Sequence, residues 1–150
     1  MHKNALNLTK QEIPADIQKV IGLYKKFSRY ADNTQEEIYY HILPSFQLNQ
    51  CKIHYNNGEL IGFTNWAFLS PEVERRFLQT TELKPEDWNS GFIAWHIDTV
   101  CVKNINKIMA WTKTYFKNLL SVGEGLNWIR INKNGKITRC SVKYKREFHG

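Results

Sequence analysis

The sequence predicts one α+β domain, residues 1–150, in which helices flank a mainly antiparallel sheet. Helix-like and strand-like segments alternate along the chain without a long linker. Two Asn-Gly dipeptides, at 57–58 and 134–135, each separate two strand-like segments and therefore predict tight hairpins. The 150 residues are 42% hydrophobic and 13% aromatic, which is enough apolar material for one core.

Two helices are expected in the first third of the chain. Thr9 and Glu12 have the spacing of a capping box and precede apolar residues at helical spacing. Thr34 and Glu37 repeat this pattern before a second apolar set. Pro44 should end the second helix, because proline has no N–H to donate and its ring crowds the preceding turn.

The remaining elements follow from strand-like apolar runs and from cap residues. Strands are expected over 51–55, 60–66, 92–102, 127–132 and 136–145, and helices over 71–78 and 105–119. Ser70 is expected to cap the first of these helices and Asn104 the second. The resulting order, ααββαβαββ, implies an α+β domain with a mainly antiparallel sheet.

Charge is unevenly distributed. The net charge is +7, and residues 126–150 alone carry +6. Such a stretch favours an acidic partner, although basic residues also protect a solvated strand face from edge pairing. The pI of about 9.3 is compatible with nucleic acid, but no nucleic-acid-binding motif is present, so no nucleic-acid partner is expected.

Composition also limits the cellular setting. No apolar run approaches the roughly 20 residues of a membrane span, so no stable membrane insertion is expected. The N-terminal residues lack a signal-peptide core, which predicts a cytoplasmic protein. Cys51, Cys101 and Cys140 have no metal-binding or CxxC spacing and are interpreted as reduced core residues. No metal site and no bound cofactor are predicted.

Two segments carry a family resemblance. Residues 43–70 begin Leu-Pro-Ser-Phe-Gln-Leu-Asn-Gln-Cys and end Thr-Asn-Trp-Ala-Phe-Leu-Ser, and residues 86–98 read Glu-Asp-Trp-Asn-Ser-Gly-Phe-Ile-Ala-Trp-His-Ile-Asp. The combination resembles the lysine acyltransferases that activate RTX toxins (hemolysin-activating acyltransferases). The resemblance covers most of residues 20–132. It implies a GNAT-like fold and acyl transfer from an acyl carrier protein to an internal lysine of a protoxin.

In that family a histidine and an aspartate carry catalysis. The resemblance places the aspartate at Asp98, and counting without gaps places the histidine at Tyr30, where no imidazole stands. Tyr30 is therefore a candidate site residue that can donate to an oxyanion. His41 is the nearest histidine, but its apolar neighbours favour a structural role. His54 is expected to face solvent from the first hairpin.

His96 is the proposed substitute for the missing histidine. It precedes Asp98 by two residues on a predicted strand, so both side chains should leave the same face, roughly 6.5–7 Å apart. A histidine is a suitable base near neutral pH, and a carboxylate can orient it. The alternative is that the His96 ring only replaces an aromatic residue in packing. The loop 88–91 is a candidate source of backbone N–H donors for an oxyanion.

Three functions remain open. The missing histidine favours a member of the family that matures siderophore microcins, joining a siderophore group to the C-terminus of a peptide. The first alternative is fatty acylation of an internal lysine of an RTX protoxin, with an acyl-carrier-protein-linked donor. The second alternative is a non-catalytic adaptor in a toxin-maturation complex. The expected partners are a toxin precursor, a second maturation subunit or acyl carrier protein, and a second copy of the chain in a homodimer.

Overall fold

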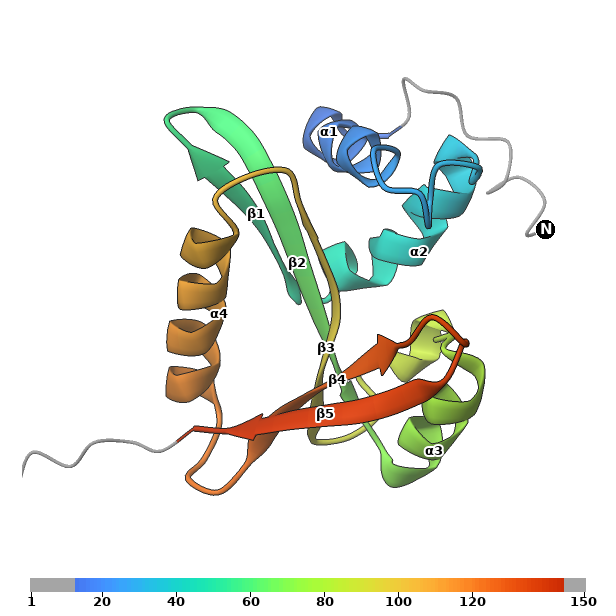
Figure 1. Ribbon diagram of the computed structural model, residues 1–150, viewed down its shortest axis with the longest axis vertical. Helices are drawn as coiled ribbons and strands as arrows, with labels where there is room; N and C mark the ends of the chain where they lie inside the picture. Colours follow the sequence, from blue (N-terminus) through green and yellow to red (C-terminus); the bar gives the residue numbers. More distant parts are fainter. Residues whose placement is uncertain (1–12, 145–150) are drawn as a thin grey trace, which may run out of the picture.

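The structure is a computed structural model that describes residues 13–144 (Figure 1). Helices and strands alternate much as the sequence predicts. The elements are α1 (Ala15–Tyr24), α2 (Gln35–Gln47), β1 (Cys51–Asn56), β2 (Glu59–Leu69), α3 (Pro71–Thr80), the short 3-10 helix η3 (Pro85–Asp87), β3 (Ile93–Cys101), α4 (Ile105–Leu119), β4 (Gly125–Ile131) and β5 (Ile137–Lys143).

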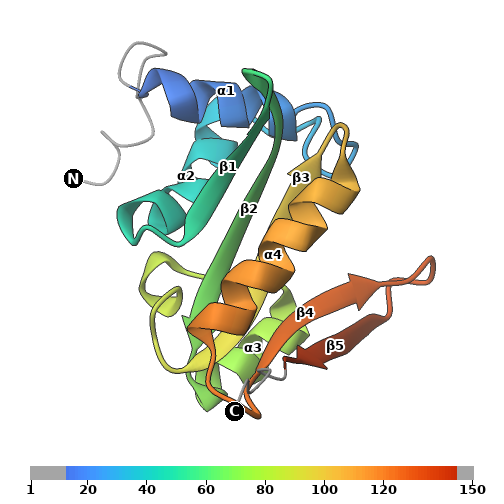
Figure 2. The same ribbon diagram turned by 90° about the vertical axis from the view of Figure 1, so that its left-hand side faces the viewer.

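The strands form one five-stranded sheet in the order β1-β2-β3-β4-β5. Every neighbouring pair is antiparallel except β3 and β4, which helix α4 connects in parallel. This parallel pair is short, since only Ala94 with Leu126 and Trp95 with Asn127 are in register. Beyond these residues the β4–β5 hairpin turns away from β3 (Figure 2). The predicted α+β class and mainly antiparallel sheet are confirmed.

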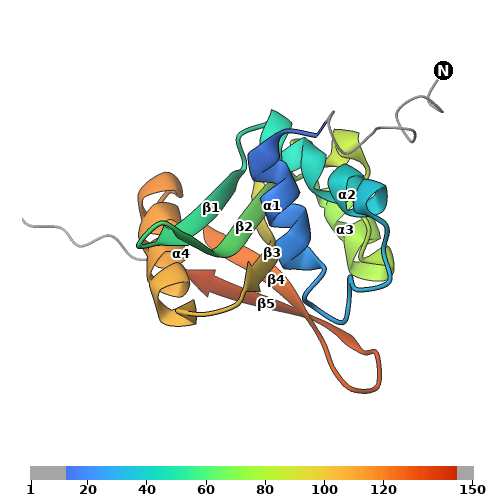
Figure 3. The ribbon, with the colours of Figure 1, turned by 90° about the horizontal axis from the view of Figure 1, so that it is seen from above.

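Helices cover both faces of the sheet. Helices α1, α2 and α3 lie on one face and α4 lies on the other, as the view from above shows (Figure 3). On the first face Phe63 and Val100 pack against α1 and α2, and Trp95 packs against α3. On the other face Trp66 packs against Phe116 of α4. The alternation of side chains along β2 and β3 therefore decides which residues can meet.

The predicted first hairpin and the second capping box are confirmed. Asn57 and Gly58 both have positive φ, 52° and 80°, as the first predicted hairpin requires. The Thr34–Glu37 capping box is present: the Glu37 N–H donates to Thr34 Oγ1 at 3.1 Å, and the Thr34 N–H donates to Glu37 Oε1 at 2.7 Å. The capping box predicted at Thr9 and Glu12 lies outside the described residues. The three cysteines are free and half-buried.

Three local predictions were wrong. Helix α2 continues through Pro44 to Gln47, because Phe46, in the turn beyond the proline, stacks on Phe63 of the sheet at a ring distance of 5.4 Å. Asn104 begins α4 without a side-chain cap; its backbone is left-handed, with φ of 59°. His54 is buried rather than solvent-facing, and its Nε2 lies 2.9 Å from Thr64 Oγ1.

Candidate active site

A β-bulge in β3 determines which way Asp98 points. Asn65 of β2 is in register with Asp98, but the next residue, Trp66, is in register with His96, so Ile97 is an extra residue. An extra residue shifts the alternation of side chains by one. Ile97 therefore packs on the α3 side of the sheet, and Asp98 lies on the same face of the sheet, toward α1 and α2. His96 lies on the other face and lines a cavity beside α4.

Asp98 is the centre of a buried hydrogen-bonded cluster. Its side chain is 7% exposed and accepts bonds from Tyr24 Oη at 2.8 Å, from Tyr30 Oη at 3.1 Å and from His41 Nε2 at 2.6 Å. Burial by itself raises the carboxyl pKa, but the nearby His41 and these three bonds outweigh burial, so the pKa of Asp98 is lower than its ordinary value. Asp98 is therefore ionised at neutral pH.

His41 is the histidine that contacts Asp98, a role that the sequence analysis assigned to His96. It lies in α2, 57 residues before Asp98, and its side chain is 35% exposed. An ionised carboxylate can only accept hydrogen bonds, so the Nε2 atom of His41 carries the proton and a neutral ring leaves Nδ1 with a lone pair. His41 lines a cavity of about 340 Å³ together with Tyr30, Trp88 and Ile97.

Tyr30 lies in this cluster, so the position reached by gap-free counting does contact Asp98. Its hydroxyl proton is directed at Asp98 Oδ1, however, and not at the cavity as expected of an oxyanion donor. Burial, followed by the Asp98 charge, raises the pKa of Tyr30 above its ordinary value, and the pKa of buried Tyr24 is raised for the same reasons. Both tyrosines therefore stay protonated and hold the carboxylate.

Buried polar side chains connect the bulge to the helix that carries His41. The Asp98 N–H donates to Asn65 Oδ1 at 2.9 Å, and Asn65 Nδ2 lies 3.4 Å from Ser45 Oγ. Ser45 Oγ in turn donates to the backbone oxygen of Ile42 at 2.6 Å. Asn65 and Ser45 are both fully buried, where an unpaired polar group is costly. These bonds fix Asp98 relative to Ser45 of α2, which lies one helical turn beyond His41.

His96 does not share a face with Asp98, so that geometric prediction was wrong. The expected i, i+2 alternation fails because the bulge adds Ile97 to the count. His96 lies on the α4 side, where its Nε2 is 2.6 Å from Thr99 Oγ1, three residues along the strand. Burial lowers the pKa of His96 to about 4, so its ring is neutral at pH 7.

Two of the four backbone N–H groups of the loop 88–91, expected as oxyanion donors, are already bonded within the protein. The N–H groups of Ser90 and Gly91 both donate to the backbone oxygen of Phe68, at 2.8 and 3.1 Å. These two N–H groups are therefore not free to hold an oxyanion. In residues 13–144 no group of three His, Cys, Asp or Glu side chains is placed to hold a metal ion, and no helix is long and apolar enough to cross a membrane.

A signal for His41 was present in the sequence. His41 lies in the helix predicted to begin after Thr34, and Ser45 follows it by four residues, so a helix that continued past Pro44 would place both polar side chains on one face. Gap-free counting from Leu43 leads past His41 to Tyr30, and both side chains contact Asp98. The histidine of this site therefore stands at a different chain position from the one that the count gives.

The fold and the site together define an α+β protein with a buried carboxylate that orients a half-exposed histidine. Comparison with known proteins gives the family. Residues 10–140 match the RTX toxin acyltransferase family. The chain therefore belongs to this family.

Three individual relatives are named for the acylation of lysine. Lysine-acyltransferase RtxC of Vibrio cholerae serotype O1 is 36% identical over 83 residues, covering 51% of this chain and 54% of the relative. Leukotoxin-activating lysine-acyltransferase LtxC of Aggregatibacter actinomycetemcomitans is 34% identical over 112 residues, covering 73% and 60%. Protein-lysine myristoyltransferase HlyC of Escherichia coli is 37% identical over 60 residues, covering 39% and 35%. The matches thus span about half of these relatives' lengths.

Proposed function

We propose that this chain transfers a long-chain acyl group from a thioester to the side-chain amine of a lysine in a toxin precursor. The observation that supports this most is the His41–Asp98 pair, with 2.6 Å between Nε2 and Oδ2, at a cavity. Membership of the RTX toxin acyltransferase family and the lysine-acyltransferase names of its relatives support the same reaction class.

The pair suits a general-base mechanism. In the proposed step the lysine nitrogen attacks the thioester carbonyl while Nδ1 of His41 takes the proton that the nitrogen loses. Asp98 stabilises the imidazolium that forms and holds the ring in the required tautomer. Collapse of the tetrahedral intermediate then restores the carbonyl, breaks the C–S bond and leaves the amide, and the sulfur takes the proton from His41 and departs as the thiol.

The acceptor proposed here, a protoxin lysine, differs from the microcin C-terminus that the sequence analysis put first. The siderophore-microcin interpretation depended on the short chain and on the histidine missing near Tyr30, and the contact of His41 with Asp98 supplies a histidine by another route. The relatives reported above are named for lysine acylation. We therefore place lysine acylation of a protoxin first, with an acyl-carrier-protein thioester as the donor, and treat the microcin reaction and the adaptor role as outcomes of the test.

The test is acyl transfer by the purified chain, followed by intact-protein mass spectrometry. The chain is incubated with myristoyl acyl carrier protein and either an RTX protoxin or a microcin peptide supplied with its glycosylated catecholate. Acylation of an internal protoxin lysine that is lost in His41→Gln supports the proposal. Modification of the microcin C-terminus alone would select the siderophore reaction, and no modification with either acceptor would select the adaptor.

A further inference from the structure

The cavity that His41 lines has a mostly apolar wall and one carboxylate. Its volume is about 340 Å³. The apolar residues come from α3, from β3 and from the segment between them: Phe77, Leu83, Trp88 and Ile97. Among the described residues that line this cavity, Glu82 is the only carboxylate. A wall of this kind suits a ligand with an aliphatic stem and a cationic end, which is the form of a lysine side chain.

Glu82 has no cationic partner in the described part of the protein. The four ion pairs found in residues 13–144 use other carboxylates: Glu59, Glu74, Asp87 and Asp98. Arg29 lines the same cavity, but its guanidinium lies over the Tyr30 ring, with 5.4 Å between Cζ and the ring centroid. Glu82 is exposed, so its charge can meet a ligand at the mouth of the cavity.

The backbone that leads into Glu82 has an unusual conformation. Thr81, at the end of α3, has φ of 58° and ψ of 16°, a left-handed conformation that is rare for a β-branched residue. The Thr81 N–H donates to the Phe77 oxygen at 2.8 Å, and the Glu82 N–H donates to Thr80 Oγ1 at 3.2 Å. Backbone strain of this kind persists where the surrounding structure holds it, and it concentrates at functional sites. Here the turn brings Thr81, Glu82 and Leu83 to the His41 cavity.

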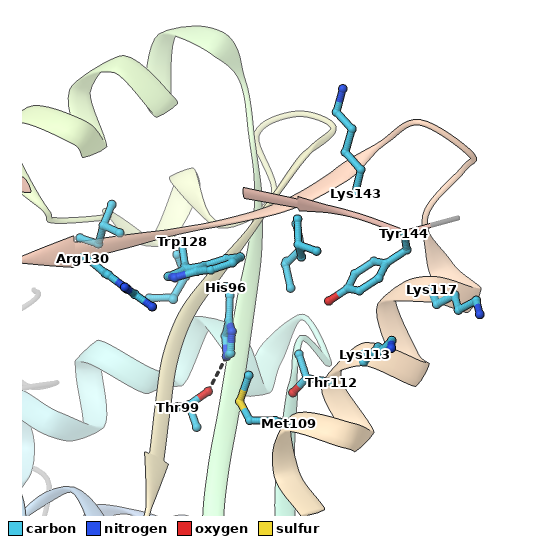
Figure 4. A pocket seen from close by; sticks show the side chains of 14 residues that line it. His96, Thr99, Met109, Thr112, Lys113, Lys117, Trp128, Arg130, Lys143 and Tyr144 are labelled. Atoms are coloured by element: carbon cyan, nitrogen blue, oxygen red, sulfur yellow. Dashed lines mark hydrogen bonds between the residues drawn. The ribbon is translucent and has the colours of Figure 1, made fainter. Parts of the chain in front are cut away.

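The cavity beside α4 has a different charge. It has a volume of about 850 Å³, and no carboxylate of the described residues lines it. Four basic residues do, as Figure 4 shows: Lys113, Lys117, Arg130 and Lys143. Like charges repel, so a protonated lysine side chain is disfavoured there. Of these two cavities, the one with Glu82 and His41 is therefore the one that attracts an ammonium group.

We propose that Glu82 recognises the acceptor: its carboxylate binds the ammonium group of the acceptor lysine at the mouth of the His41 cavity. A lysine is protonated at neutral pH, so it arrives charged. Its stem then packs on Phe77 and Trp88, where burial favours the neutral amine, and one proton passes to water. The neutral nitrogen is left beside Nδ1 of His41. This inference rests on the proposed acyl transfer and adds the residue that selects the acceptor.

The first experiment measures binding without an acyl donor. Nα-acetyl-lysine methylamide and its norleucine counterpart, which keeps the four-carbon stem and lacks the amine, are each titrated into nitrogen-15-labelled protein and followed by NMR at residues 81–83. Exposed ion pairs contribute little, so we expect the parent to bind the lysine compound about two- to fivefold more tightly than the norleucine compound. In Glu82→Gln the two compounds should bind equally. Neither compound has a neighbouring side chain, so the difference reports on the ammonium group alone.

The second experiment reverses the charge. Glu82→Lys should raise the KM for the protoxin by about tenfold, because repulsion of the acceptor lysine replaces attraction. Because Glu82 acts in binding, kcat and the KM for myristoyl acyl carrier protein should stay within about twofold of the parent. The matched control is Glu86→Lys, which reverses an exposed carboxylate outside the cavity and should leave both KM values unchanged. Urea unfolding establishes that both variants are folded.

The outcomes separate this inference from the proposed function. If the lysine compound binds through Glu82 but no protoxin lysine is acylated, the ammonium site stands and the proposed function fails. If Glu82→Lys acylates the protoxin with the KM of the parent while His41→Gln does not transfer, the acyl transfer stands and the inference fails. Equal binding of the two compounds to the parent, or a lower kcat of Glu82→Lys with an unchanged protoxin KM, would also overturn the inference.

Discussion

Replacing Asp98 with asparagine is the most informative single change in this protein. The substitution keeps the shape of the side chain and removes its charge. An asparagine nitrogen facing His41 would donate a hydrogen bond, so Nε2 of the histidine would have to accept it and Nδ1 would carry the proton. The base would then be in the wrong tautomer to take a proton from the acceptor amine. We expect the transfer rate to fall by about 10²–10⁴.

The effect on stability follows from the three bonds that Asp98 accepts. A hydrogen bond to a charged group stabilises a fold by roughly 1.5–3 kcal/mol, and a neutral one by roughly 0.5–1.5 kcal/mol. Three bonds that each lose about 1 kcal/mol give an upper limit of about 3 kcal/mol, and relief from burying a charge offsets part of it. The protein should therefore remain folded at 25 °C.

The assay combines acyl transfer with urea unfolding at several pH values. Because the folded-state pKa of Asp98 is below its ordinary value, the unfolded chain takes up the proton first as the pH falls. The stability advantage of the parent over Asp98→Asn should be complete above about pH 5 and should shrink as the pH falls through the folded-state pKa.

Asp87→Asn is the matched control for Asp98→Asn. Asp87 is also a buried carboxylate, but its bonds come from Arg76 and the Lys84 N–H rather than from His41. It should lose stability without losing the transfer rate. A folded Asp98→Asn protein that transfers at nearly the parent rate would refute the catalytic assignment.

Three further changes test the same geometry. His41→Gln should reduce transfer by at least about 10²-fold in a folded protein, because glutamine cannot take a proton from the acceptor amine; a parent-like rate would exclude His41 as the base. His96→Phe should leave transfer within about twofold of the parent and cost about 1 kcal/mol for the lost bond to Thr99, since the ring is neutral and on the other face; a rate loss in a stable variant would return His96 to the mechanism. Asn65→Leu should cost about 1–3 kcal/mol, because the Asp98 N–H loses its partner, and should lower kcat more than KM; an unchanged kcat would leave Asn65 with a purely structural role.

The sequence determined the elements and their chemistry to a large extent. Hairpins at Asn-Gly, the Thr34–Glu37 cap and the alternation of helix and strand depend on neighbouring residues, and such short-range preferences are present in the linear chain. The identity of Asp98 as a site candidate also came from the sequence, through its place in a recognisable segment. Pro44 was misjudged because packing of the following turn on the sheet outweighed the local cost.

The partner of Asp98 was decided only by the tertiary structure. The single extra residue Ile97 reverses the alternation along β3, and nothing in the local sequence marks where a bulge will form. That reversal turns His96 toward α4 and turns Asp98 toward α1 and α2, where His41 lies 57 residues earlier in the chain. Contacts between residues so far apart depend on how the helices pack on the sheet, and no periodicity within one segment encodes them.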